Sequence, residues 1–132
     1  MIEDISASIL IHGERFSPNQ AEKITGLELQ DKMEVGDIAS KGRYKGKAIP
    51  YGSGLLVPPK HIDMFDRMMW LVKALDGKID QLKEIGADEP NIHIGYFYKN
   101  QCNLVLSKEE LTALAKLEID FSFSCYDVSD EE

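Results

Sequence analysis

The chain lacks the residues and spacings that mark several common classes of protein. It has only two cysteines in 132 residues, Cys102 and Cys125, and they do not form a CxxC pair. We therefore expect reduced thiols in a cytoplasmic protein, and not a disulfide-stabilised secreted domain. The three histidines, His12, His61 and His93, lack the spacing of a zinc site, so we predict no metal centre.

Long apolar runs are also missing. No stretch approaches the length of a membrane-spanning helix, so no membrane partner is expected. The first residues, Met1 to Asp4, are acidic where a signal peptide needs a basic segment. No G-x-S-x-G nucleophile elbow is present, and Gly46-Lys47 is followed by Ala48, where a phosphate-binding loop requires serine or threonine. We therefore predict no cofactor and no enzyme activity of a familiar type.

Basic residues are fewer than acidic ones. The chain has 15 Lys and Arg residues and 23 Asp and Glu residues, which gives a formal net charge of −8. This balance argues against a nucleic-acid partner, whose phosphates need a basic surface. It favours a basic protein partner, or plain solubility. Candidates for electrostatic steering lie in the acidic C-terminal segment, which we expect to be frayed. They are Asp127, Asp130, Glu131 and Glu132.

Periodicity predicts the elements of one α+β domain spanning residues 1–132. Alternation predicts strands over Asp4–Glu14, Ile92–Tyr98 and Ile119–Tyr126. A glycine-rich hairpin is expected from strands near Arg43–Ile49 and Gly54–Val57, with Gln30–Ser40 mostly loop. Helices are predicted from Pro18 to Thr25, from about Lys60 to Asp76 with a second piece to Gly86, and from Lys108 to Glu118. Ser17 is the expected N-cap of the first helix, and Ser107 with Glu110 forms a capping box for the last.

The fold class predicted from these elements is α+β, with a mainly antiparallel sheet of about five strands and helices packed on one face. The last helix joins two strands that we expect to be parallel. The predicted core consists of Ile9, Ile11, Phe65, Met69, Val72, Ile94, Tyr96, Leu111, Leu114, Phe121 and Phe123.

Serines and histidines gather on the side of this sheet that carries no helix. Serine with histidine suggests nucleophilic catalysis, but a solvated sheet face is polar in any case. A partner-docking face is the better interpretation, because an exposed sheet offers a broad, rigid surface. The residues concerned are Ser6, Ser8, His12, His93, Ser122 and Ser124.

The basic hairpin is a second candidate site. Arg43, Lys45 and Lys47 alternate with glycines, whose backbone amides can bind an anion. The simpler interpretation is that these cations protect an exposed strand edge from pairing with other chains.

A third candidate is the carboxylate series Asp76, Asp80 and Glu84, at four-residue spacing, with Asp120 alone in a strand. Paired carboxylates can transfer protons or bind metal, but a solvated helix face is the better interpretation of these residues.

Both ends of the chain resemble a known family. The matching segments are Ser6–Ile11, Ser17–Leu27, Ile92–Ile94, Leu106–Leu117 and Ser124–Asp127. In these segments the chain resembles an uncharacterised bacterial domain family, catalogued as domain of unknown function 4279. The middle hairpin departs from the pattern, since a tryptophan is expected there and Trp70 lies in a helix. The resemblance implies a small α+β domain and no known activity.

The leading hypothesis is a non-enzymatic protein-binding module. By analogy of size and charge, it is an immunity protein that neutralises a cognate toxin, with a basic nuclease as the natural case. The alternative is a small ligand-binding domain or enzyme that uses the serine and histidine face or the basic hairpin. The identity of the partner and the oligomeric state are left open.

Overall fold

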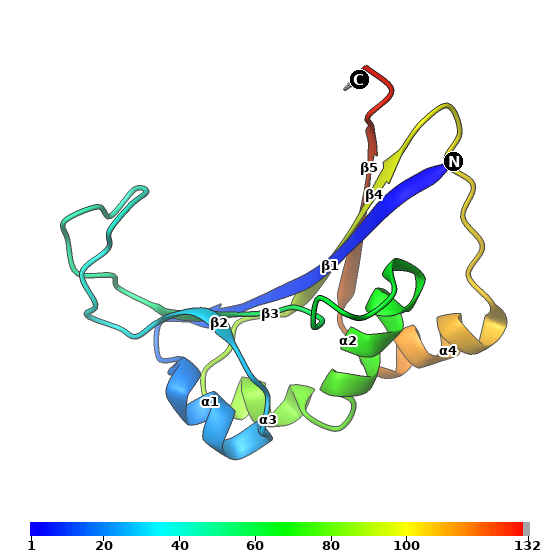
Figure 1. The fold of residues 1–132 in the computed structure, drawn as a ribbon. Helices are drawn as coiled ribbons and strands as arrows, with labels where there is room; N and C mark the ends of the chain where they lie inside the picture. Colours follow the sequence, from blue (N-terminus) through cyan, green and yellow to red (C-terminus); the bar gives the residue numbers. More distant parts are fainter. Residues whose placement is uncertain (131–132) are drawn as a thin grey trace. The chain divides into compact units, whose positions relative to one another are not determined.

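The computed structural model describes residues 1–130 as an α+β chain with a five-stranded sheet in the order β2-β3-β1-β4-β5 (Figure 1). The strands are β1 Ile2–Gly13, β2 Gln30–Met33, β3 Gly52–Leu56, β4 Asn91–Tyr98 and β5 Asp120–Asp127. The helices are α1 Pro18–Thr25, α2 Arg67–Leu75, α3 Ile79–Glu84, α4 Lys108–Lys116 and the short 3₁₀ helix η1 Met64–Asp66. β4 is antiparallel to β1 and parallel to β5, while β2 and β3 are antiparallel. The predicted fold class, α+β with a mainly antiparallel sheet of about five strands, is confirmed.

The described chain divides into two compact units. Unit 1 comprises Met1–Ile9, Val57–Asp76 and the chain from Asn91 onward, and unit 2 comprises Leu10–Leu56 and Gly77–Pro90. The first part of β1 thus belongs to unit 1 and its last residues to unit 2. Each unit is described by itself.

Unit 1 is built on β1, β4 and β5. The pairing of β1 with β4 places Ile5 opposite Tyr96 and Ile9 opposite Ile92, and all four side chains are buried. Because side chains alternate between the faces of a strand, these residues define one buried face. The helices α2 and α4 contact each other within this unit. A groove lined by residues of η1, α2 and α4 together with Ile5 and Tyr96 shows that these helices lie on the buried face.

Local signals fix the helices of unit 1. Ser107 Oγ accepts a hydrogen bond from the Glu110 amide at 3.0 Å, and the Glu110 carboxylate accepts one from the Ser107 amide at 3.0 Å, so the predicted capping box is present. α2 begins later than predicted. Asp63 caps the 3₁₀ turn instead, its carboxylate accepting from the Phe65 amide at 3.1 Å.

Unit 2 packs α1 against α3, β2 and β3. α1 has the predicted bounds, with Ser17 as N-cap, Pro18 in the first turn and Gly26 in the left-handed conformation after its end. β3 lies very close to the turn before α1, because an added Cβ on Gly52 would fall 1.8 Å from the Phe16 carbonyl oxygen. Only glycine permits this contact.

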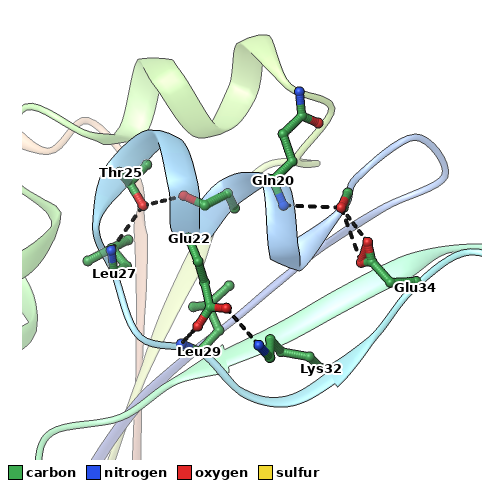
Figure 2. A network of polar contacts seen from close by, with 9 residues as sticks. Gln20, Glu22, Thr25, Leu27, Leu29, Lys32 and Glu34 are labelled. Carbon is green, nitrogen blue, oxygen red and sulfur yellow. Dashed lines mark hydrogen bonds and ion pairs between the residues drawn. The ribbon is translucent and has the colours of Figure 1, made fainter.

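A polar network ties α1 to the segment that follows it (Figure 2). The Glu22 carboxylate accepts from the Leu29 amide at 2.9 Å and from Lys32 Nζ at 2.7 Å. Ser17 Oγ donates to the Glu34 carboxylate. The hydrogen bond from Lys32 and that from Leu29 hold the pKa of Glu22 below its ordinary value. The network therefore anchors both ends of β2 to one helix.

Several members of the predicted core are exposed. Phe65 is 63% exposed because it lies in η1, outside the helical period of α2. Leu111 is 51% exposed, since α4 buries Leu114 and the segment after it buries Leu117 instead. Phe123 is 42% exposed because β5 is the last strand of the sheet. Met69 and Phe121 are half-buried, and the other predicted core residues are buried, namely Ile9, Ile11, Val72, Ile94, Tyr96 and Leu114.

Within residues 1–130, the helices are too short or too polar for any of them to cross a lipid bilayer.

Candidate functional site

The face of unit 1 opposite its buried side chains carries the predicted serines in two rows. We call it the outer face. In the first row Ser8, His93 and Ser122 are register partners across β1, β4 and β5. In the second row Ser6, Gly95 and Ser124 are partners in the same way. Five of the six residues predicted from the sequence for this face are therefore brought together.

A stacked aromatic pair completes the outer face. Phe97 and Tyr126 are register partners, with ring centroids 5.0 Å apart and planes inclined by 21°. An added Cβ on Gly95 would lie 2.6 Å from Ser6 Oγ and 3.6 Å from a ring carbon of each aromatic residue. The two rings and the serine hydroxyl therefore cover the glycine closely. Tyr126 is nonetheless 49% exposed.

The hydrogen bonding of this face does not favour catalysis. Ser122 Oγ donates to Asn91 Oδ1 at 3.1 Å, whereas a nucleophilic serine would donate to His93. The sixth predicted residue, His12, belongs to unit 2, where its Nδ1 lies 3.4 Å from an Asp88 carboxylate oxygen. Among the described residues there is no cluster of three or more potential metal ligands.

The acidic candidates at the C-terminal side are only partly described. Asp127 ends β5 opposite Tyr98, and Ser129 donates to its carboxylate through Oγ at 2.6 Å and through its amide at 2.9 Å. These two bonds hold the pKa of Asp127 below its ordinary value. Asp130 is exposed. Glu131 and Glu132 lie outside the described residues.

The predicted basic hairpin is wrong in its first strand. Residues 36–50 form a loop of unit 2 between β2 and β3, held by isolated bridges from Ile38 to Ala48 and from Ala39 to Lys45. In place of the predicted strand, β2 pairs with β3, and β2 was expected to be loop. β2 escapes a period-two search because its register shifts between Gln30 and Met33.

The three basic residues predicted as a site, Arg43, Lys45 and Lys47, are exposed on this loop. The Arg43 guanidinium lies 5.7 Å from the centre of the Tyr44 ring. The amides of Lys45 and Lys47 donate within the loop, to the carbonyls of Gly42 and Tyr44, and the Gly46 amide donates to Ala39. These three amides are therefore occupied and are not available to an anion. These cations do not protect the edge of a strand, because Arg43, Lys45 and Lys47 lie outside β2 and β3.

The carboxylate series does not share one helix. Asp76 is the C-cap of α2 in unit 1, whereas Asp80 and Glu84 lie in α3 of unit 2, with Gly77 in the left-handed region between the helices. Asp120 is the exposed first residue of β5.

The helix side of unit 1 holds two features that periodicity did not reveal. One is an apolar groove of about 290 Å³ beside Tyr96, whose rim includes the exposed Phe65 and Val105. The other is the approach of the two thiols, with Cys102 Sγ 3.7 Å from Cys125 Sγ. Cys125 is exposed, because β5 is the last strand of the sheet in the part of the chain that the structure describes. Desolvation and the neighbouring thiol raise the pKa of Cys102.

Comparison with known proteins identifies one family. The family described as Domain of unknown function (DUF4279) matches residues 3–128. No curated protein and no solved structure matches the chain.

Proposed function

The chain belongs to the family of domains of unknown function described as DUF4279, and we propose that it is a non-enzymatic protein-binding module. Its partner docks on the outer face of unit 1. The observation that carries this proposal is the stacked Phe97–Tyr126 pair, half-open to solvent beside two rows of small polar side chains.

This arrangement matches the anatomy of a binding surface. Interfaces concentrate their binding energy in a few aromatic or arginine side chains, surrounded by polar residues that contribute little. The Tyr126 ring already stacks on Phe97 in the free protein, next to Gly95. A pre-ordered ring loses little side-chain entropy when a partner covers it.

Charge indicates the chemistry of the partner. The chain carries a net charge of −8, and Asp120 and Asp127 lie at the two ends of β5, beside the outer face. Such a field speeds the capture of a basic protein and disfavours an acidic one. We infer that the partner is basic, and that the most specific role consistent with these features is neutralisation of a cognate bacterial toxin domain, for example a nuclease, by an immunity protein.

The test is a co-expression experiment. If the proposal is right, a toxin domain encoded beside this chain's gene arrests bacterial growth alone, and co-expression of the chain restores growth. Tyr126→Ala should weaken binding by roughly thirtyfold, as expected for an aromatic residue that contributes about 2 kcal/mol. The matched control is Phe65→Ala, which removes an exposed aromatic ring from the helix side of unit 1. Equal effects of the two substitutions, or growth arrest that the chain does not relieve, would count against the proposal.

A further inference from the structure

The strand β5 is the last strand of the sheet, so one of its two edges is free of a neighbouring strand among the described residues. β5 is the terminal strand of the sheet order, is eight residues long and pairs with β4 without a register shift over its whole length. Six of its eight residues are exposed. Natural proteins protect such an edge with lysine, proline, bulges or a covering segment. The sequence Asp120-Phe121-Ser122-Phe123-Ser124-Cys125-Tyr126-Asp127 contains neither lysine nor proline.

The first two residues after β5, within the part of the chain that the structure describes, lie against β4 and not over this edge. Val128 donates its amide to the Tyr98 carbonyl at 2.8 Å, and Ser129 Oγ accepts from the Asn100 amide at 3.3 Å. Both bonds hold the residues after β5 to the end of β4, on the paired side. Among the described residues, the segment after β5 therefore leaves the backbone groups of the free edge available.

The pairing of β5 with β4 identifies the backbone groups that face the free edge. In a parallel pair, alternate residues direct both the N–H and the C=O toward the neighbouring strand. Val128 directs its amide to β4, so the even-numbered residues of β5 face β4. The odd-numbered residues direct their N–H and C=O groups to the free edge, and these are Phe121, Phe123, Cys125 and Asp127.

The charges around β5 indicate which kind of strand can pair with its free edge. Residues 117–130 contain four acidic side chains and no basic one. The acids lie at the two ends of the strand, Glu118 and Asp120 at one end and Asp127 and Asp130 at the other. A second copy of this chain would bring the same charges to the edge, and like charges on paired strands are destabilising. An extended segment with a basic residue toward each end would find complementary charge at both.

We propose that β5 binds its partner by strand addition, taking up an extended, basic segment of the partner protein as a sixth strand. In this mode main-chain hydrogen bonds supply affinity, and the alternating side chains supply specificity. Tyr126 then contacts the partner on the outer face, and Phe123, 42% exposed, contacts it on the helix side. The inference rests on the proposed function, because it names how the partner of that function is held.

The experiment is amide hydrogen exchange by NMR with a defined probe, the blocked peptide Lys-Thr-Val-Thr-Val-Thr-Lys. In the free protein, the amides of Phe121, Phe123 and Cys125 should exchange fast and those of Ser122 and Ser124 slowly. Peptide at about ten times its Kd should slow the odd-numbered amides by about tenfold, because about a tenth of the protein stays free. The even-numbered amides should change little. The same peptide with proline at its centre should have no effect.

Charge variants test the choice of occupant. Asp120→Asn and Asp127→Asn should each weaken binding of the peptide by about two- to fivefold, as expected for exposed ion pairs. Glu109→Gln, on α4, is the matched control and should leave binding unchanged. No slowing of the Phe123 and Cys125 amides, or equal slowing by the proline peptide, would overturn the proposal. Slowing that depends on protein concentration without peptide would also overturn it, in favour of a second copy as occupant.

The two proposals fail separately. If a partner protein needs Tyr126 for binding but the odd-numbered amides of β5 still exchange fast in the complex, the docking face is supported and strand addition is refuted. Protection of those amides by the peptide, with no toxin-neutralising activity, would retain the strand site and remove the proposed function.

Discussion

Replacing Arg67 with methionine is the substitution whose cost can be worked out most directly from unit 1. Arg67 opens α2, and its guanidinium reaches three partners. Nη1 donates to the Ile5 carbonyl at 2.5 Å and to Asp4 Oδ1 at 2.9 Å, and Nε donates to the Ile62 carbonyl at 3.2 Å. One side chain therefore joins the start of α2 to β1 and to the turn before η1.

The carbonyl bonds should dominate the cost. The arginine side chain is 26% exposed, while Asp4 is 57% exposed. A hydrogen bond that involves a charged group contributes about 1.5–3 kcal/mol, and an exposed ion pair about 0–1 kcal/mol. Methionine keeps most of the apolar stem but leaves two carbonyls unpaired. We expect Arg67→Met to lower the free energy of unfolding by about 2–4 kcal/mol, and Asp4→Asn to lower it by less than about 1 kcal/mol.

Urea unfolding measures both values. Trp70, the one tryptophan of the chain, lies in α2 one turn after Arg67, and its fluorescence reports on this helix. The midpoint should fall for Arg67→Met with an unchanged slope. If Asp4→Asn costs as much as Arg67→Met, the ion pair and not the carbonyl bonds stabilises the junction. If Arg67→Met costs less than about 1 kcal/mol, the geometric argument fails.

Two further predictions concern unit 2. Gly52→Ala should lower the free energy of unfolding by about 3 kcal/mol, because its Cβ would lie 1.8 Å from the Phe16 carbonyl oxygen. Gly46→Ala, with φ of 77° and open space around it, should lower it by about 1–2 kcal/mol. Equal losses of stability in thermal unfolding would contradict the steric explanation. Glu22→Gln should make the free energy of unfolding depend less on pH in the acidic range. The folded pKa of Glu22 is lowered by Lys32, so its contribution is present above the unfolded pKa and is lost as the pH falls through the folded pKa. Identical pH profiles for the two proteins would show that the pair contributes nothing.

The sequence predicted best what depends on neighbouring residues. The bounds of α1 follow from Ser17, Pro18 and Gly26, and the start of α4 follows from the reciprocal bonds of its capping box. These interactions span three or four residues, so a short segment contains all the information that determines them. The outer face was predictable for the same reason, because alternation alone assigns side chains to faces.

Burial was predicted less well, because it depends on which element lies next to a strand. Alternation correctly places Phe123 and Cys125 on the helix side, but it cannot show that β5 is the last strand and leaves both exposed. β2 was missed because Asp31 takes a φ of 51° and the register shifts, which removes the period-two pattern. The approach of Cys102 to Cys125 joins residues of different elements, and no spacing rule connects them.

The central claim is that the outer face of unit 1 is where a partner protein binds. Site-directed photo-cross-linking tests it most directly, with a photoreactive residue in place of Ser6 on the outer face or in place of Thr112, which is exposed on α4. With the purified toxin domain as partner, a cross-link from position 6 and none from position 112 is the predicted result. A cross-link from position 112 alone would place the binding surface on the helix side and contradict the account.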